Sequence, residues 1–139
     1  MIQRLSLGHQ EAKLAIQTIE AEITRRGKAG VIAVADVHGE LIALLRMDNA
    51  PLPSTIIAAN KAFSAARERK PTQLIGQDAR DPQNGFDIAY FGDPHFIGWP
   101  GGVPVFVNGV VVGSVAVSGF PGEEDIELAE IGIAAIKNI

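Results

Sequence analysis

The stretch Val103-Pro-Val-Phe-Val-Asn-Gly-Val-Val-Val-Gly-Ser-Val-Ala-Val117 decides the fold class of this chain. It places Asn108-Gly109 between two runs of β-branched residues, which is the strongest short-range signal for a β-hairpin. Pro104 cannot donate a ladder hydrogen bond, so the first strand is expected at a sheet edge or at its own start. The chain therefore contains at least one antiparallel pair of strands.

Another hairpin, the first along the chain, is predicted nearer the N-terminus. Apolar runs occupy residues 31–37 and 41–47, and the His38-Gly39 turn joins them. Two such runs across a short glycine-containing connection indicate a hairpin. Both runs are apolar at nearly every position, so we expect both strands to be covered on both faces, with helices as the cover.

Three segments carry the periodicity and the end signals of helices. They run from Ser6, as N-cap, to about Arg26, from Ser54, as N-cap, to about Lys70, and from Glu123 onward. In the first helix, Glu22 and Arg26 lie four residues apart in the order that favours an ion pair. Residues 76–100 are rich in Gly, Pro and Asp and predict a long loop, with a short helix over 86–91.

The order of elements is helix, hairpin, helix, long loop, hairpin, helix. Hairpins impose antiparallel pairing, so the fold class is α+β. The length of 139 residues suits one domain, which we expect to span 1–139, and the composition of 47% hydrophobic and 20% charged residues is that of a globular protein.

Composition also excludes several classes of function. The chain has no cysteine, which excludes disulfides, cysteine-bound zinc and thiol catalysis. The net charge of −4 lacks the basic footprint of a nucleic-acid-binding protein. The sequence has no apolar run of 18 residues and no apparent signal peptide, so we expect a cytoplasmic protein without a membrane-spanning helix.

The segment Trp99-Pro100-Gly101-Gly102 is the first candidate for ligand binding. Two glycines allow backbone N–H groups to approach a ligand without obstruction by a Cβ atom, and such donors bind carboxylates or phosphates. The alternative is a tight corner that closes the sheet.

Aromatic residues gather in the same part of the chain, where six of the eight lie between positions 86 and 106. Their rings, together with His95, could wall a flat aromatic cofactor such as haem, with His95 as the axial iron ligand. The alternative is that these rings fill the core or a subunit interface.

Charged residues near the N-terminal hairpin, the first along the chain, form a third candidate site. Arg46 and Lys61 suit an anionic ligand, and Asp48 lies beside them in sequence. If catalysis occurs, Lys61 as a desolvated amine and Asp48 as a proton carrier are the candidates. The alternative is an ordinary ion pair of Arg46 or Lys61 with Asp48, or a lysine that reaches the surface.

Several motifs taken together resemble the GlcG/HbpS-like proteins and the C-terminal part of the PduO-type adenosyltransferases. They are Val34-Ala-Asp-Val-His-Gly-Glu-Leu41, Arg46-Met-Asp-Asn-Ala-Pro-Leu52, Asn60-Lys61-Ala62, Pro100-Gly-Gly-Val-Pro104, Asn108-Gly109, Val112-Gly113, Val117-Ser118-Gly119 and Glu124-Asp125. The resemblance covers essentially the whole chain. The chain differs from the family pattern at Asn49, where the family usually has glycine.

The resemblance implies a profilin-like fold, with a five-stranded antiparallel sheet and helices on its faces. It also implies a homo-oligomer and, for some members, haem binding. We therefore expect a protein that binds a small organic ligand, with haem as the implied cofactor, accessory to a catabolic pathway or to haem and redox handling. The alternatives are a small enzyme acting on an organic-acid intermediate and a ligand-free assembly subunit.

Overall fold

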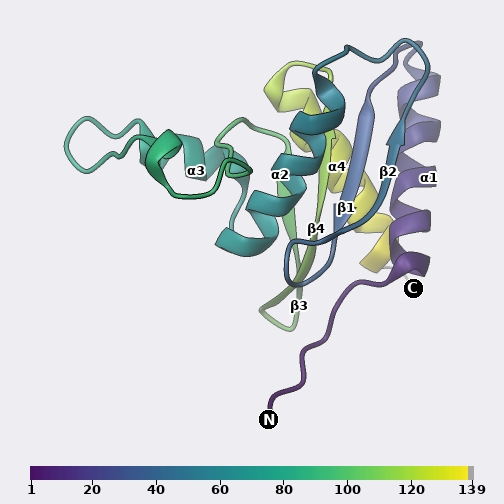
Figure 1. The fold of residues 1–139 in the computed structure, drawn as a ribbon. Coiled ribbons are helices and arrows are strands. Elements are labelled where there is room, and N and C mark those ends of the chain that lie inside the picture. The colour runs from purple at the N-terminus through teal and green to yellow at the C-terminus, as the bar shows by residue number, and fades with distance from the viewer. Residues whose placement is uncertain (138–139) are drawn as a thin grey trace.

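A computed structural model describes residues 1–137 as a four-stranded antiparallel sheet with helices on both faces (Figure 1). The elements in chain order are α1 (His9–Arg25), β1 (Val31–Ala35), β2 (Leu41–Arg46), α2 (Ser54–Glu68), α3 (Thr72–Ala79), the short 3-10 helix η1 (Ile88–Tyr90), β3 (Gly102–Val107), β4 (Val110–Ser118) and α4 (Gly122–Lys137). The strand order is β2-β1-β4-β3. The α+β class and the two hairpins are confirmed.

The helices form two layers around the sheet. Helices α1 and α4 pack against each other and against one face of the sheet, where the larger of two apolar clusters lies. Helix α2 covers the other face through small residues, and its Ala58 and Ala62 pack against Val31, Ala33 and Ala116. Small side chains let α2 lie close to the sheet, which leaves little room for a ligand between them.

The hairpin between β3 and β4 forms as its sequence predicts. Asn108 and Gly109 both have positive φ, 51° and 77°, as a two-residue turn of the favoured handedness requires. Strand β3, which contains Pro104, is an edge strand of the sheet. Asn49 also has a positive φ of 69°, a conformation that asparagine and glycine adopt more readily than other residues, so asparagine fits the position where the family resemblance implies glycine.

Burial of the first hairpin differs from the prediction. Every residue of β1 is buried, whereas β2 is only partly buried along its length. The reason is the strand order: β1 lies inside the sheet and β2 lies at its edge, where helices cover it incompletely. An apolar run therefore marked both strands without distinguishing the central one from the edge strand.

The five-stranded sheet that the family resemblance implies is wrong for residues 1–137, which contain four strands. The N-terminal segment lies beside β4, but only Leu7 bonds to it, through its N–H to the carbonyl of Val112 at 2.8 Å. One bond does not make a ladder. The two hairpins that the residues themselves predict account for all the strands in the described part of the chain.

Helix α1 begins later than predicted. Its N-cap is Gly8 instead of Ser6, and Glu11 closes the first turn by accepting the N–H of Gly8 at 3.3 Å. The Ser6 hydroxyl instead accepts the N–H of Val37 at 3.1 Å, which joins the N-terminal segment to the first hairpin. The Glu22–Arg26 pair is present as predicted, at 2.7 Å.

Residues 72–100 form an arm that projects from one side of the sheet (Figure 1). The arm contains α3, η1 and the loops around them. At its base, Gly76 and Gly98 approach so closely that a Cβ atom at either position would collide with the backbone of the other. None of the helices between residues 1 and 137 is long and apolar enough to cross a membrane.

Candidate functional site

Lys61 lies in the middle of α2 and its side chain is 1% exposed. Its Nζ donates to the carbonyl oxygen of Val117 at 2.9 Å and to Oδ2 of Asp125 at 3.0 Å. Asp125 lies in the first turn of α4, is 2% exposed, and also accepts the N–H of Phe120 through Oδ1 at 3.2 Å. This buried ion pair joins two helices that cover opposite faces of the sheet.

The glycine pair explains how the Lys61 side chain reaches from α2 to Asp125 of α4. A Cβ atom at Gly101 would lie 2.7 Å from Nζ of Lys61 and 2.9 Å from Cβ of Asp125, and one at Gly102 would lie 2.5 Å from the carbonyl oxygen of Lys61. Gly101 also has a φ of 130°, which side chains disfavour. The missing side chains at the start of β3 therefore leave the space that α2 and the lysine occupy.

The glycine pair lies in the protein interior. Both glycines are buried, and the N–H of Gly102 donates to Oγ1 of Thr72 at 2.9 Å. Lys61 and Asp125 occupy the space in front of Gly101. A ligand could contact Gly101 and Gly102 only after these groups move, so their predicted part in ligand binding has no open approach in this structure.

Burial shifts the titration of both members of the ion pair. Desolvation raises the pKa of Asp125 to about 6, although the charge and hydrogen bond of Lys61 oppose this shift. Desolvation likewise lowers the pKa of Lys61, against the attraction of Asp125. The low-dielectric surroundings thus favour the neutral form of each group more strongly than water does.

We expect Asp125 to make stability fall between about pH 4 and pH 6. Its pKa in the folded state is about 6, above the ordinary 3.8, so over this range the folded chain keeps a proton that the unfolded chain releases. The contribution is complete below about pH 4 and is lost as pH rises through about 6. Asp125→Asn does not titrate, so the unfolding free energy of the natural chain minus that of the variant should fall across this window. Urea denaturation at pH 4, 5, 6 and 7 measures it, and a difference that is flat or rises with pH would contradict the expectation.

Trp99 and Pro100 line a different site, a pocket of about 620 Å³ in the arm. Its walls come from α3 and from the loop segments between α3 and β3. They include Phe86, Ile88, Ile97 and the charged side chains of Arg80 and Asp87. Pockets of this size, mostly apolar with a few polar groups, are typical of small-molecule sites. The pocket combines flat apolar walls with one guanidinium group.

The aromatic rings of the arm form a continuous cluster. Phe86, which lines the pocket, stacks on Phe91 at 5.7 Å between ring centroids, and Phe91 contacts Phe96 edge-on at 4.5 Å. Phe96 in turn contacts Phe63 of α2 at 5.3 Å, and Phe63 contacts the ring of His95 at 5.4 Å. The cluster therefore extends from the pocket wall to His95.

His95 is oriented by a carboxylate. Its Nδ1 lies 2.7 Å from Oδ1 of Asp93, which also accepts the backbone N–H of His95 at 2.9 Å. These two hydrogen bonds lower the pKa of Asp93, so the carboxylate is ionised at neutral pH and can only accept. Nδ1 therefore carries the proton, and in the neutral ring Nε2 has the lone pair, the arrangement that metal-binding histidines commonly show.

Arg46 and Asp48 lie apart from these groups. They line a hollow of about 540 Å³ between the end of β2 and the end of α1, together with Lys28 and Glu20. In the sheet register, β1 and β4 separate Arg46 from Gly102. Lys61 pairs with Asp125 and not with Asp48, and within the described residues no ion pair joins Arg46 to Asp48.

The sequence predictions did not include Asp125, Thr72 or Arg80 as site residues. Asp125 appears in the sequence as one of three acids that favour a helix N-terminus, and nothing in that pattern marks it as the buried one. Its place in the helix provides the only signal: with Leu128 and Ala129, which are fully buried, it lies on the inward face of α4.

Comparisons with known proteins agree with this architecture. The chain is 33% identical to the protein GlcG of Escherichia coli (strain K12) over 118 residues, which is 85% of each chain. The crystal structure of the Klebsiella pneumoniae protein ORFY superposes with a TM-score of 0.93 at 28% identity, covering 100% of this chain and 96% of ORFY. A crystal structure of a PduOC–heme complex has a TM-score of 0.84 at 22% identity, covering 94% of this chain and 95% of that one, and shows the same fold.

A family model described as haem degrading protein HbpS-like matches residues 7–134. This match spans all four strands and nearly all of the helical layer that surrounds them. The chain therefore belongs to the HbpS-like family.

Proposed function

We propose that this chain binds haem through the pocket of the arm. The observation that carries the proposal is the arm pocket itself, of about 620 Å³, which offers flat apolar walls from Phe86 and Trp99 together with the cation of Arg80. Haem combines a planar apolar ring with carboxylate side chains, and these groups match that lining. Membership of a family whose model is described as haem degrading supports the proposal.

The lining of the pocket contains no His, Tyr, Met or Cys, so an iron ligand must come from outside it. We propose His95, which lies on the same arm, is exposed, and keeps Nε2 available because Asp93 holds the proton on Nδ1. Bound haem would supply iron that binds oxygen species or transfers electrons. Arg80 would hold the carboxylates, and the aromatic cluster would exclude water from the ring.

Exposed rings on the arm support the prediction of a homo-oligomer. Tyr90 is 88% exposed and Trp99 is 56% exposed, and Phe86 and Phe91 are exposed nearby. Gathered apolar groups of this kind usually mark a binding surface. We propose that a second copy covers Tyr90 and Phe91, which do not line the arm pocket. The cytoplasmic location and the link to a catabolic pathway stay predictions of the sequence.

We expect purified protein to bind hemin saturably with a sharp Soret band. His95→Ala should weaken hemin binding about tenfold or more and shift the band, because the iron loses its ligand. The same variant should bind iron-free protoporphyrin IX as the natural chain does, whereas Arg80→Gln should weaken both ligands. Absorbance and fluorescence titrations measure these affinities.

His38→Ala is the matched control, because His38 is an exposed turn residue that does not line the arm pocket. It should leave both affinities unchanged. A broad spectrum identical to that of hemin with an unfolded control would overturn haem binding. Equal hemin spectra for His95→Ala and His38→Ala would remove His95 as the ligand while leaving the pocket in place.

A further inference from the structure

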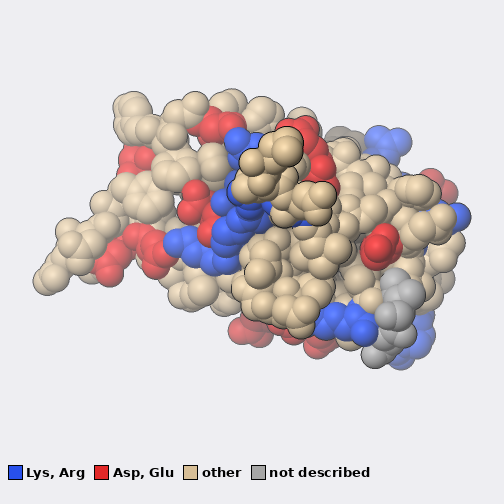
Figure 2. Space-filling model, turned by 90° about the horizontal axis from the view of Figure 1, so that it is seen from below, with Lys and Arg blue, Asp and Glu red and all other residues tan. Residues whose placement is uncertain are grey.

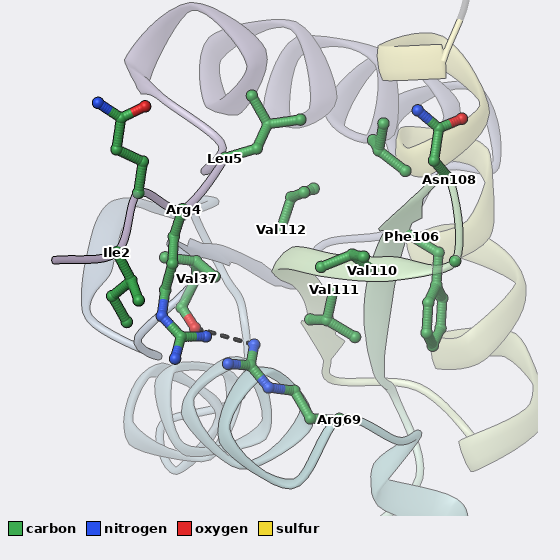
Figure 3. A pocket seen from close by; sticks show the side chains of 13 residues that line it. Ile2, Arg4, Leu5, Val37, Arg69, Phe106, Asn108, Val110, Val111 and Val112 are labelled. Carbon is green, nitrogen blue, oxygen red and sulfur yellow. Dashed lines mark hydrogen bonds between the residues drawn. The ribbon is translucent and has the colours of Figure 1, made fainter.

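A second pocket, of about 760 Å³, lies at the opposite end of the sheet from the buried ion pair. It is bounded by the N-terminal segment, by the tip of the β3–β4 hairpin and by the end of α2 (Figure 3). Most of its walls are apolar, and they include Leu5, Val37, Phe106, Val110, Val111 and Val112. It shares no residue with the arm pocket.

Among residues 1–137, Arg4 and Arg69 are the only charged residues that line this pocket. Arg4 comes from the N-terminal segment and Arg69 from the end of α2, and their guanidinium groups point toward one another at one end of the pocket (Figure 3). No Asp or Glu lines the pocket, and no ion pair within residues 1–137 involves either arginine. Two like charges that line one pocket repel each other, and an anion bound between them lowers that cost.

Asp36 is an acidic residue close to Arg4, and its Oδ1 braces a turn. Asp36 lines a smaller hollow next to the pocket, together with Arg4. Its Oδ1 accepts the backbone N–H of His38 at 2.8 Å and of Glu40 at 3.0 Å, so it serves to brace the turn of the first hairpin. The chain as a whole has a net charge of −4. On the face seen from below, however, Lys and Arg side chains gather near the middle, beside acidic side chains of the arm (Figure 2).

Arg69 is held in position by an unusual backbone. It is the C-cap of α2 and has a φ of 59°, a left-handed conformation that helices usually assign to glycine. Its NH1 group donates to the carbonyl oxygen of Val37 at 3.0 Å. This bond uses one of the five N–H donors of the guanidinium and turns the group toward the pocket, so the rest remain for a ligand.

We infer that this pocket binds a small organic acid whose carboxylate lies between Arg4 and Arg69 and whose apolar body packs against the valines of the hairpin. Guanidinium groups bind carboxylates through paired hydrogen bonds. The apolar walls disfavour inorganic phosphate, because phosphate has no apolar group to cover them and they would stay exposed to solvent. The site is separate from the one proposed for haem and requires no residue of the arm.

The test uses octanoate and its neutral counterpart octanamide as probes, followed by isothermal titration calorimetry. Octanoate should bind saturably, less tightly as salt is raised, and at least about tenfold more tightly than octanamide, because the amide has no charge for the arginines. Arg4→Gln and Arg69→Gln should each weaken octanoate about tenfold or more. Val110→Glu, at a position 62% exposed, should abolish binding by placing a carboxylate in the pocket.

Arg25→Gln is the matched control, because Arg25 is 72% exposed on α1 and, among the residues that the structure describes, pairs with Glu22 alone. It should bind octanoate as the natural chain does. Arg4 lies in an exposed segment, so Arg4→Gln keeps the test valid even if Arg69→Gln proves unstable. Equal binding of octanoate and octanamide, equal affinity of Arg4→Gln and Arg25→Gln, or no binding because a second copy covers the pocket would each overturn the inference.

Discussion

Lys61→Met is expected to lower the free energy of unfolding by about 3–5 kcal/mol at pH 8. The variant removes the only cation that contacts Asp125 among the described residues, and it leaves the carboxylate 2% exposed in a region of low dielectric constant. It also removes the donor to the carbonyl of Val117. The loss should be smaller at pH 5, because an unpaired Asp125 can then take up a proton. Urea denaturation followed by circular dichroism measures both values.

Two variants show where the cost of Lys61→Met comes from. Lys61→Met combined with Asp125→Asn should recover more than half of the lost stability, because no buried charge remains and the asparagine oxygen can still accept the N–H of Phe120. Lys13→Met replaces an exposed lysine of α1 and should change stability by less than about 0.5 kcal/mol. A loss below about 1 kcal/mol for Lys61→Met at pH 8 would show that the ion pair is not structural.

Gly101→Ala is expected to destabilise the fold by about 3–5 kcal/mol, or to prevent folding. The new Cβ atom would lie 2.6 Å from the carbonyl oxygen of Val117 and 2.7 Å from Nζ of Lys61. These contacts belong to a backbone strand and to a buried ion pair, and neither can move without breaking hydrogen bonds. The φ of 130° adds strain of about 1–3 kcal/mol for any residue with a side chain.

Gly92→Ala separates the two causes. Gly92 also has a positive φ, of 92°, but a Cβ atom there meets nothing within 4 Å. It should therefore show the backbone strain without the collision, and its loss of stability should be clearly smaller than that of Gly101→Ala. Similar losses in the two variants would mean that backbone strain alone makes glycine necessary at position 101. Chemical denaturation of both variants under one condition provides the comparison.

The local elements were largely readable from the residues. The Asn108-Gly109 turn and the Glu22–Arg26 pair depend on neighbours within four positions, and the structure contains both. The start of α1 was not readable, because Ser6 bonds to Val37, and that distant partner exists only once the first hairpin has packed beside the N-terminal segment. A capping residue is a local choice only when no remote group competes for its side chain.

The candidate site could be predicted only in part. Trp99 and Pro100 do line a pocket with aromatic walls, as their sequence neighbourhood indicated. Arg46, Asp48 and Lys61 formed one candidate site in the sequence, but the fold directs Lys61 inward to Asp125 and places Arg46 and Asp48 at a separate hollow. Whether any of these residues binds a ligand stays a prediction, which the variants described above test.

The sequence alone determined the fold class, the two hairpins and the family, because these follow from turn residues, from periodicity and from motifs within short windows. Only the tertiary structure decided which charges meet. Lys61 and Asp125 are 64 positions apart, and Arg4 and Arg69 are brought to one pocket from the start of the chain and the end of α2. Burial then shifts the pKa values of Lys61 and Asp125, because desolvation and the charge of a neighbour depend on packing and not on the order of residues.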